Sequence, residues 1–148
     1  PAVLDRLASF ARLVVASPDY LARQNAVPQT PHDLLSHACI RYRFTSGKLY
    51  RWEFERDGKS VVLDVGGPLT LDSPLLMAEA ALHGVGIAYV YEGYVCEHLQ
   101  SGRLVQLLPD WTPVYAGLCL YYPRQRHITA ALRAFIDLAK EARGAFAV

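Results

Sequence analysis

The sequence predicts an α/β fold, because short runs rich in β-branched residues alternate with segments that have helical spacing. Two observations carry most of this prediction: alternating runs flank Asp57-Gly58, and one apolar stripe follows the last segment from Ile128 to Ala142. Strands that alternate with helices favour a largely parallel or mixed sheet. With 148 residues, of which 52% are hydrophobic and 20% charged, the chain is long enough to bury a core.

The first elements are expected to be a strand, a short helix and a second strand. Arg12 to Ser17 is a β-branched run that ends at a proline, and Asp19 to Arg23 has the spacing of a brief helix. Leu34 and Leu35 fill a helical turn after two prolines. Cys39 to Phe44 alternates in side-chain character, which predicts a strand with Arg41 and Arg43 on one face.

The clearest local pattern is a β-hairpin. Residues 52–56 and 61–65 alternate apolar and polar side chains on either side of Asp57-Gly58. A type I′ turn is expected here because glycine tolerates the positive φ that this turn requires. The second strand should end at Gly66-Gly67-Pro68, and Leu69 to Leu71 should form another short strand.

A helix is expected to begin after Ser73. The Ser73 side chain can cap the helix, and Pro74 suits the first helical position, where no backbone N–H is needed. Gly84 should end the helix. The residues that the spacing places on one buried face are Leu75, Ala78, Leu82 and Val85.

The second half of the chain continues the alternation. A buried strand is expected from Gly86 to Val90, a helix from Glu92 to Gln100 and a strand from Leu104 to Leu108. A long apolar strand should cover Tyr115 to Tyr122. The closing helix has the strongest pattern, with a stripe made of Ile128, Ala131, Leu132, Phe135, Leu138, Ala139 and Ala142.

Composition argues against several function classes. A net charge of +1 gives no electrostatic reason to expect direct binding to nucleic acid or an anionic membrane. No apolar run approaches the roughly 18 residues that span a bilayer. The three cysteines lie far apart, which favours a reduced, cytosolic chain. The five histidines are dispersed without metal-binding spacing, so we expect no metal and no cofactor.

Catalytic motifs are not evident either. The sequence has no GxSxG nucleophile motif and no Walker A segment. Gly84-Val85-Gly86 follows a helix and precedes a strand, which reverses the order found in dinucleotide-binding folds. Glu53 and Glu55 lie on an exposed hairpin face, where carboxylates more often solubilise than catalyse. We therefore predict no catalytic residues.

Several polar residues fit a ligand-binding site. The helix that starts at Asp72-Ser73 presents free N–H groups and the positive end of its dipole. The strand that carries Arg41 and Arg43 ends in a polar loop, and Tyr91-Glu92 ends the strand from Gly86 to Val90. Ligands of open α/β sheets bind beside such strand ends. The alternative is that Ser73 only caps its helix and that the arginines are surface residues.

Five ordered segments resemble a known family: RLVVASPDYLAR, PHDLLSHACIRYRF, LDSPLLMAEAALHGVGIAYV, SGRLVQLLPDW and LYYPRQRHITAALRAFIDLAKE. Together they resemble the effector-binding domain of LysR-type transcriptional regulators from about Leu7 to Glu141. The resemblance implies a fold like type 2 periplasmic-binding proteins, with two Rossmann-like lobes joined by crossover strands. The crossovers should be Leu13 to Ser17 and Leu118 to Tyr122.

The resemblance also implies a domain division. Residues 1–148 are expected to be a partial effector-binding domain, with residues 13–120 as the second lobe and its crossover strands. Residues 121–148 should return to pack on the first lobe, which is largely missing from the sequence, as are the winged helix-turn-helix and the linker helix that family members carry.

Carried over position by position, the resemblance assigns an effector site to three segments. These are Arg43, Phe44, Thr45 and Ser46 at a strand end, Asp72 and Ser73 at a helix start, and Tyr91, Glu92 and Gly93 in the next loop. Glu92 departs from the Leu-Pro that often follows this strand in the family. An acidic group there leaves the charge of the effector open.

The expected function is therefore sensing. The domain should bind a small-molecule effector in an interlobe cleft and so control transcription in the cytoplasm, as a homodimer or homotetramer that contacts DNA only through a winged helix-turn-helix. No membrane partner is expected. The alternatives are a periplasmic solute-binding protein of the same fold and an enzyme on a related two-lobe scaffold.

Overall fold

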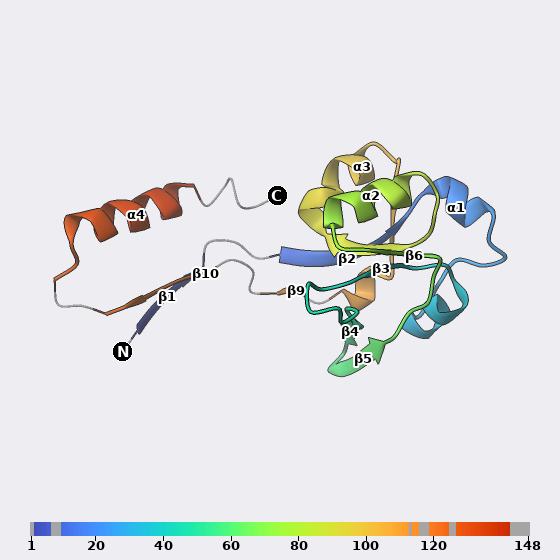
Figure 1. Ribbon diagram of the computed structural model, residues 1–148, viewed down its shortest axis with the longest axis horizontal. Coiled ribbons are helices and arrows are strands. Elements are labelled where there is room, and N and C mark those ends of the chain that lie inside the picture. Colours follow the sequence, from blue (N-terminus) through green and yellow to red (C-terminus); the bar gives the residue numbers. More distant parts are fainter. Residues whose placement is uncertain (1, 7–9, 113, 116–118, 125–126, 143–148) are drawn as a thin grey trace. The chain divides into compact units, whose positions relative to one another are not determined.

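The computed structural model describes residues 2–6, 10–112, 114–115, 119–124 and 127–142 (Figure 1). The chain forms two compact units, which are described separately. One unit consists of Pro1–Ala11 with Val114–Val148, and the other consists of Arg12–Pro113. Among the described residues, no helix is both long enough and apolar enough to cross a membrane.

The larger unit contains most of the secondary structure. Its strands are β2 (Phe10–Ala16, whose first two residues belong to the smaller unit), β3 (Ile40–Tyr42), β4 (Trp52–Arg56), β5 (Lys59–Leu63), β6 (Leu69–Leu71), β7 (Ala88–Tyr91) and β8 (Val105–Leu107). Its helices are α1 (Pro18–Ala22), α2 (Pro74–Leu82) and α3 (Cys96–Gln100), with 3-10 turns η1 (Pro31–Ser36), η2 (Glu92–Tyr94) and η3 (Pro109–Trp111).

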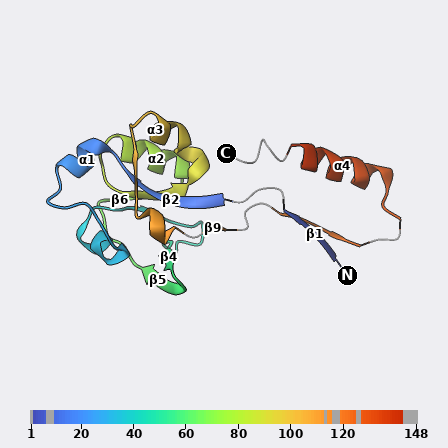
Figure 2. The ribbon, with the colours of Figure 1, turned by 180° about the vertical axis from the view of Figure 1, so that it is seen from behind.

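Strand pairing in this unit is mixed, which confirms the expected sheet type. β2 lies antiparallel to both β7 and β8, with Val14 opposite Tyr89 on one side and Leu107 on the other. β3 runs parallel to β6, and a parallel bridge joins Cys39 to Ile87. In Figures 1 and 2, α2 and α3 lie on one side of β2, and the β4–β5 hairpin lies on the other.

The structure confirms two local predictions. In the hairpin turn, Asp57 has a φ of 50° and Gly58 a φ of 76°, so both central residues are left-handed as a type I′ turn requires. At the start of α2, the Ser73 hydroxyl accepts a hydrogen bond from the Leu76 N–H at 3.4 Å. Gly84 follows the helix with a φ of 74°.

The buried face of α2 differs from the predicted one. Met77, Ala78 and Ala81 are buried, whereas Leu75 is 58% exposed and Val85 is 38% exposed. Only Ala78 of the predicted face is buried. The reason is that α2 is apolar on nearly every side, so spacing alone does not select one face.

Two other elements also differ from the sequence prediction. The helix expected from Glu92 to Gln100 is divided into η2 and α3, because Val95 between them has a non-helical φ of −131° and is fully buried. The expected strand from Tyr115 to Tyr122 is represented by two strands in the smaller unit, and residues 116–118 between them lie outside the described residues.

The smaller unit contains β1 (Ala2–Arg6), β9 (Val114–Tyr115), β10 (Cys119–Pro123) and α4 (Ala130–Glu141). β1 pairs antiparallel with β10, and β9 pairs with Phe10 and Ala11 of β2. In α4 the buried residue is Ile136, whereas Phe135 and Leu138 of the predicted stripe are 57% and 64% exposed. The predicted helix is confirmed, but its buried residue, Ile136, does not belong to the predicted apolar stripe.

The core of the larger unit joins the sheet to the hairpin. Tyr89 of β7 stacks on Phe54 of β4, with ring centres 5.2 Å apart and planes 12° apart. Trp52 lies 5.3 Å from the same Tyr89 ring. The buried cluster as a whole consists of Val14, Ala16, Tyr20, Leu34, Cys39, Trp52, Phe54, Leu63, Val65, Ile87, Tyr89, Leu107 and Leu108.

Candidate functional site

A cavity of about 250 Å³ lies in the larger unit, beside the ends of β3 and β7 and the first turn of α2. We call it the Arg12 cavity. Such a position, at strand ends and a helix start, is where open α/β sheets hold ligands. The lining consists of Arg12, Tyr42, Phe44, Tyr50, Pro74, Met77, Tyr89, Val90 and Tyr91.

Strand pairing positions the polar end of this cavity. β2 and β7 are antiparallel, and their register places Arg12 directly opposite Tyr91. Side chains that are two residues apart on a strand point to the same face, so Tyr89 and Tyr91 both approach Arg12. The same period of two makes Tyr42 and Phe44 neighbours, with ring centres 5.3 Å apart.

The Arg12 guanidinium is surrounded by tyrosine rings. Its carbon lies 4.0 Å from the centre of the Tyr50 ring and 4.7 Å from that of Tyr91. One terminal nitrogen donates a hydrogen bond to the Tyr91 hydroxyl at 3.3 Å. Burial by itself lowers the pKa of Arg12, but the nearby tyrosine hydroxyls outweigh burial and raise this pKa above its ordinary value. Arg12 therefore remains a cation at every physiological pH.

The aromatic wall is continuous with the core. The Phe44 ring lies 6.0 Å from Tyr50, and Tyr50 lies 6.4 Å from Tyr89. The Tyr89 hydroxyl donates a hydrogen bond of 2.7 Å to the backbone carbonyl of Glu53 in β4. Because Tyr89 is fixed by both the hairpin and the sheet, it gives the cavity a rigid floor.

Two of the nine residues predicted for the effector site line this cavity, namely Phe44 and Tyr91. Ser73 precedes the lining residue Pro74 and is occupied as the cap of α2. The other six are exposed and are not part of the lining: Arg43, Thr45 and Ser46 after β3, Asp72 before α2, and Glu92 and Gly93 in η2. Their part in effector binding stays a prediction.

Sequence reasoning missed the most distinctive residue of the cavity. The sequence places Arg12 only in a strand, and its position opposite Tyr91 is visible only once β2 and β7 are paired. Tyr50 precedes β4 and faces Arg12 only through tertiary packing. No periodicity in the sequence indicates that contact.

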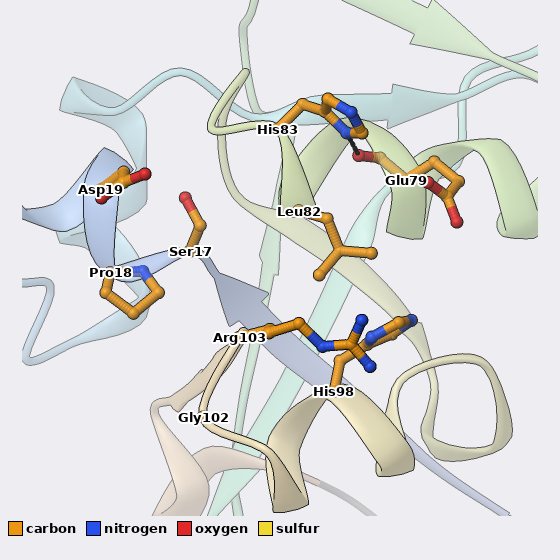
Figure 3. Close-up of a pocket in the computed structure, with 9 residues that line it drawn as sticks. All are labelled: Ser17, Pro18, Asp19, Glu79, Leu82, His83, His98, Gly102 and Arg103. Atoms are coloured by element: carbon orange, nitrogen blue, oxygen red, sulfur yellow. Dashed lines mark hydrogen bonds between the residues drawn. The ribbon is translucent and has the colours of Figure 1, made fainter.

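A second cavity, of about 460 Å³, lies between the start of α1, the end of α2 and the turn before β8 (Figure 3). Its lining includes the acidic residues Asp19 and Glu79, the basic residue Arg103 and two histidines. His83 bonds through Nδ1 to the Glu79 carbonyl at 2.9 Å. Since the three charged side chains are exposed, water solvates them well. Nowhere in the described ranges do three or more His, Cys, Asp or Glu side chains form a group that could hold a metal ion.

Comparison with known proteins matches the chain to one family model, the LysR substrate binding domain, over residues 2–144. An uncharacterized HTH-type transcriptional regulator of Escherichia coli K12, YcaN, is 39% identical over 127 residues, which are 86% of this chain and 41% of that protein. A putative transcriptional regulator of Pseudomonas aeruginosa is 37% identical over 131 residues, or 88% of this chain and 42% of that protein. The chain thus spans about two fifths of the length of these relatives.

A solved structure is similar over nearly the whole chain. The regulatory domain of CrgA, a LysR-type transcriptional regulator from Neisseria meningitidis, aligns with a TM-score of 0.71 and 25% identity. The alignment covers 95% of this chain and 68% of that domain. The predicted fold class is confirmed by this likeness.

Proposed function

The chain belongs to the LysR substrate binding domain family, and from that premise we propose that it senses a small molecule in the Arg12 cavity on behalf of a DNA-binding regulator of transcription. The family is one of transcriptional regulators rather than enzymes or periplasmic solute-binding proteins. Its members bind small-molecule effectors, contact DNA through an N-terminal domain and form oligomers. Because a regulator of transcription acts on DNA, we propose that this protein lies in the cytoplasm.

The observation that carries the proposal is the concave, largely aromatic lining with one fixed cation, Arg12. Ligand sites commonly combine apolar walls with a few fixed polar groups in this way. The lining draws on β2, β3, β7 and α2, so a ligand would contact several elements at once. A ligand that binds one arrangement of the protein more tightly shifts the population toward that arrangement, and this shift is the signal passed to the DNA-binding part.

A thermal-shift screen with a metabolite library tests this proposal, with Phe44→Ala and Val62→Ala as a matched pair. Phe44 lines the cavity and is 41% exposed, whereas Val62 is 46% exposed on the hairpin and outside the lining. We expect a true effector to raise the Tm of the wild type and of Val62→Ala, and to lose this effect in Phe44→Ala.

Equal shifts in both variants would place binding elsewhere and contradict the assignment of the site. In the cell, the same compound should change the transcripts of the parent regulator's targets. Deletion of the gene with no change in any transcript would contradict the regulatory function.

For the self-association that the family shows, we propose a homodimer or homotetramer in which the exposed side of α2 contacts a second copy. Leu75 and Leu76 are 58% and 53% exposed on this helix. A charge in an apolar interface is costly, so Leu76→Glu is expected to lower the mass measured by sedimentation velocity. Leu35→Glu is the control, since Leu35 is 54% exposed on η1. An unchanged mass for Leu76→Glu would exclude this surface.

A further inference from the structure

We infer that the Arg12 cavity takes a small aromatic carboxylate. This inference rests on the proposed sensing function and adds the chemical class of the ligand. Four properties of the cavity lead to it: the sign of its charge, the edge of the guanidinium that remains for a ligand, the nearby start of α2, and the size and aromatic lining of the space.

The charge of the lining favours an anion. Arg12 is the single fully charged side chain among the residues that line the cavity. In the described part of the chain the ion pairs are Arg51–Asp64 and Arg56–Asp57, so Arg12 forms no ion pair with a described carboxylate. A half-buried, unneutralised guanidinium disfavours a cationic ligand and gains most from an anionic one.

The orientation of Arg12 favours a carboxylate in particular. The Tyr50 and Tyr91 rings lie against the guanidinium at 4.0 and 4.7 Å. In a cation–π contact the ring lies near the guanidinium, whose N–H groups point outward from the edge of a planar fork. One of these N–H groups bonds to the Tyr91 hydroxyl. The remaining fork matches the two oxygens of a carboxylate, which is the geometry of bidentate pairs.

The start of α2 adds to this preference. Pro74, its first residue, and Met77 both belong to the lining. The positive end of the helix dipole therefore lies beside the cavity, where it stabilises negative charge. The Arg12 cation and the positive end of the α2 dipole therefore both attract a negatively charged ligand.

The size and the walls favour a flat, single-ring compound. At about 250 Å³ the cavity is smaller than the roughly 300–1,000 Å³ typical of sites for drug-sized ligands. Its lining includes the neighbouring rings of Tyr42, Phe44 and Tyr50, together with the ring of Tyr89. Aromatic walls interact best with another ring in stacked or edge-to-face contact.

Calorimetric titration of the protein with four matched probes tests the inference. Benzoate is planar and anionic, benzamide planar and neutral, benzamidinium planar and cationic, and cyclohexanecarboxylate anionic without a flat ring. We expect benzoate to bind at least tenfold more tightly than benzamide or benzamidinium, and more tightly than cyclohexanecarboxylate. Equal or stronger binding of benzamide or benzamidinium would overturn the inference.

Variants of Arg12 separate charge from geometry. Arg12→Lys keeps the charge but loses the fork, so benzoate should bind about tenfold more weakly; Arg12→Gln should abolish its binding. Arg51→Gln is the control, because Arg51 pairs with Asp64 at an exposed position outside the cavity. Far-UV circular dichroism checks that each variant is folded, and the comparison of probes on the wild type stands even if Arg12→Gln does not fold.

Different results would contradict the carboxylate inference and the proposed sensing function. If neutral or cationic compounds bind and Phe44→Ala abolishes their binding, the cavity is a sensor site for another ligand class, and only the carboxylate inference fails. If Phe44→Ala changes the binding of no compound, including benzoate, both fail.

Discussion

Replacing Gly67 with alanine is expected to destabilise the larger unit by at least about 3 kcal/mol, the upper end for overpacking a native interior. A Cβ atom on Gly67 would lie 1.8 Å from the carbonyl oxygen of Cys39 and 2.8 Å from its backbone carbon and nitrogen. These are backbone atoms, so no side chain can rotate away to make room. Cys39 is fully buried and bridges to Ile87, which fixes its backbone on the other side as well.

The adjacent glycine provides a matched control for this substitution. A Cβ atom on Gly66 would meet nothing within 4 Å, so Gly66→Ala should change stability by less than about 0.5 kcal/mol. Urea unfolding followed by tryptophan fluorescence compares the two variants. Similar midpoints for Gly66→Ala and Gly67→Ala would show that the backbone at Cys39 relaxes, contrary to this prediction.

The elements that sequence predicts well are those set by local chemistry. The hairpin turn follows from the left-handed φ that Gly58 adopts easily, and the start of α2 follows from the hydroxyl of Ser73. Both depend on contacts within about four residues. The pattern of the neighbouring side chains is then sufficient, and the structure agrees with it.

The elements that sequence predicts less well depend on distant partners. The buried face of α2 is chosen by what it meets on β7, β3 and β6, and the apolar residues around the helix leave that choice open. Val95 interrupts a predicted helix because its side chain is buried in the core. Periodicity contains no information on either contact.

The candidate site shows the same division. Phe44 and Tyr91 could be placed at strand ends from the alternation of their strands, and the structure brings both to the Arg12 cavity. Arg12 and Tyr50 are 38 residues apart (50 minus 12) and meet only when β2 and the segment before β4 come together. A cation held by rings from separate elements cannot be recognised before the fold is known.

The floor of that cavity depends on Trp52, and Trp52→Ala is expected to cost about 3–5 kcal/mol in the free energy of unfolding. The Trp52 side chain is fully buried and contacts both Tyr89, at 5.3 Å between ring centres, and Phe54, at 6.5 Å. Truncation to alanine leaves a space that these neighbours fill only in part. Chemical unfolding followed by circular dichroism measures the loss.

The variant Trp52→Phe distinguishes the contribution of the ring's volume to stability from that of the indole N–H. The indole Nε1–H is buried and has no hydrogen-bond partner in the described structure, which is unfavourable in the native state. Phenylalanine removes this donor while keeping a ring against Tyr89, so the lost contact area is partly offset. We expect Trp52→Phe to cost about 1 kcal/mol. A cost for Trp52→Phe close to that of Trp52→Ala would instead mean that the indole N–H contributes to native stability.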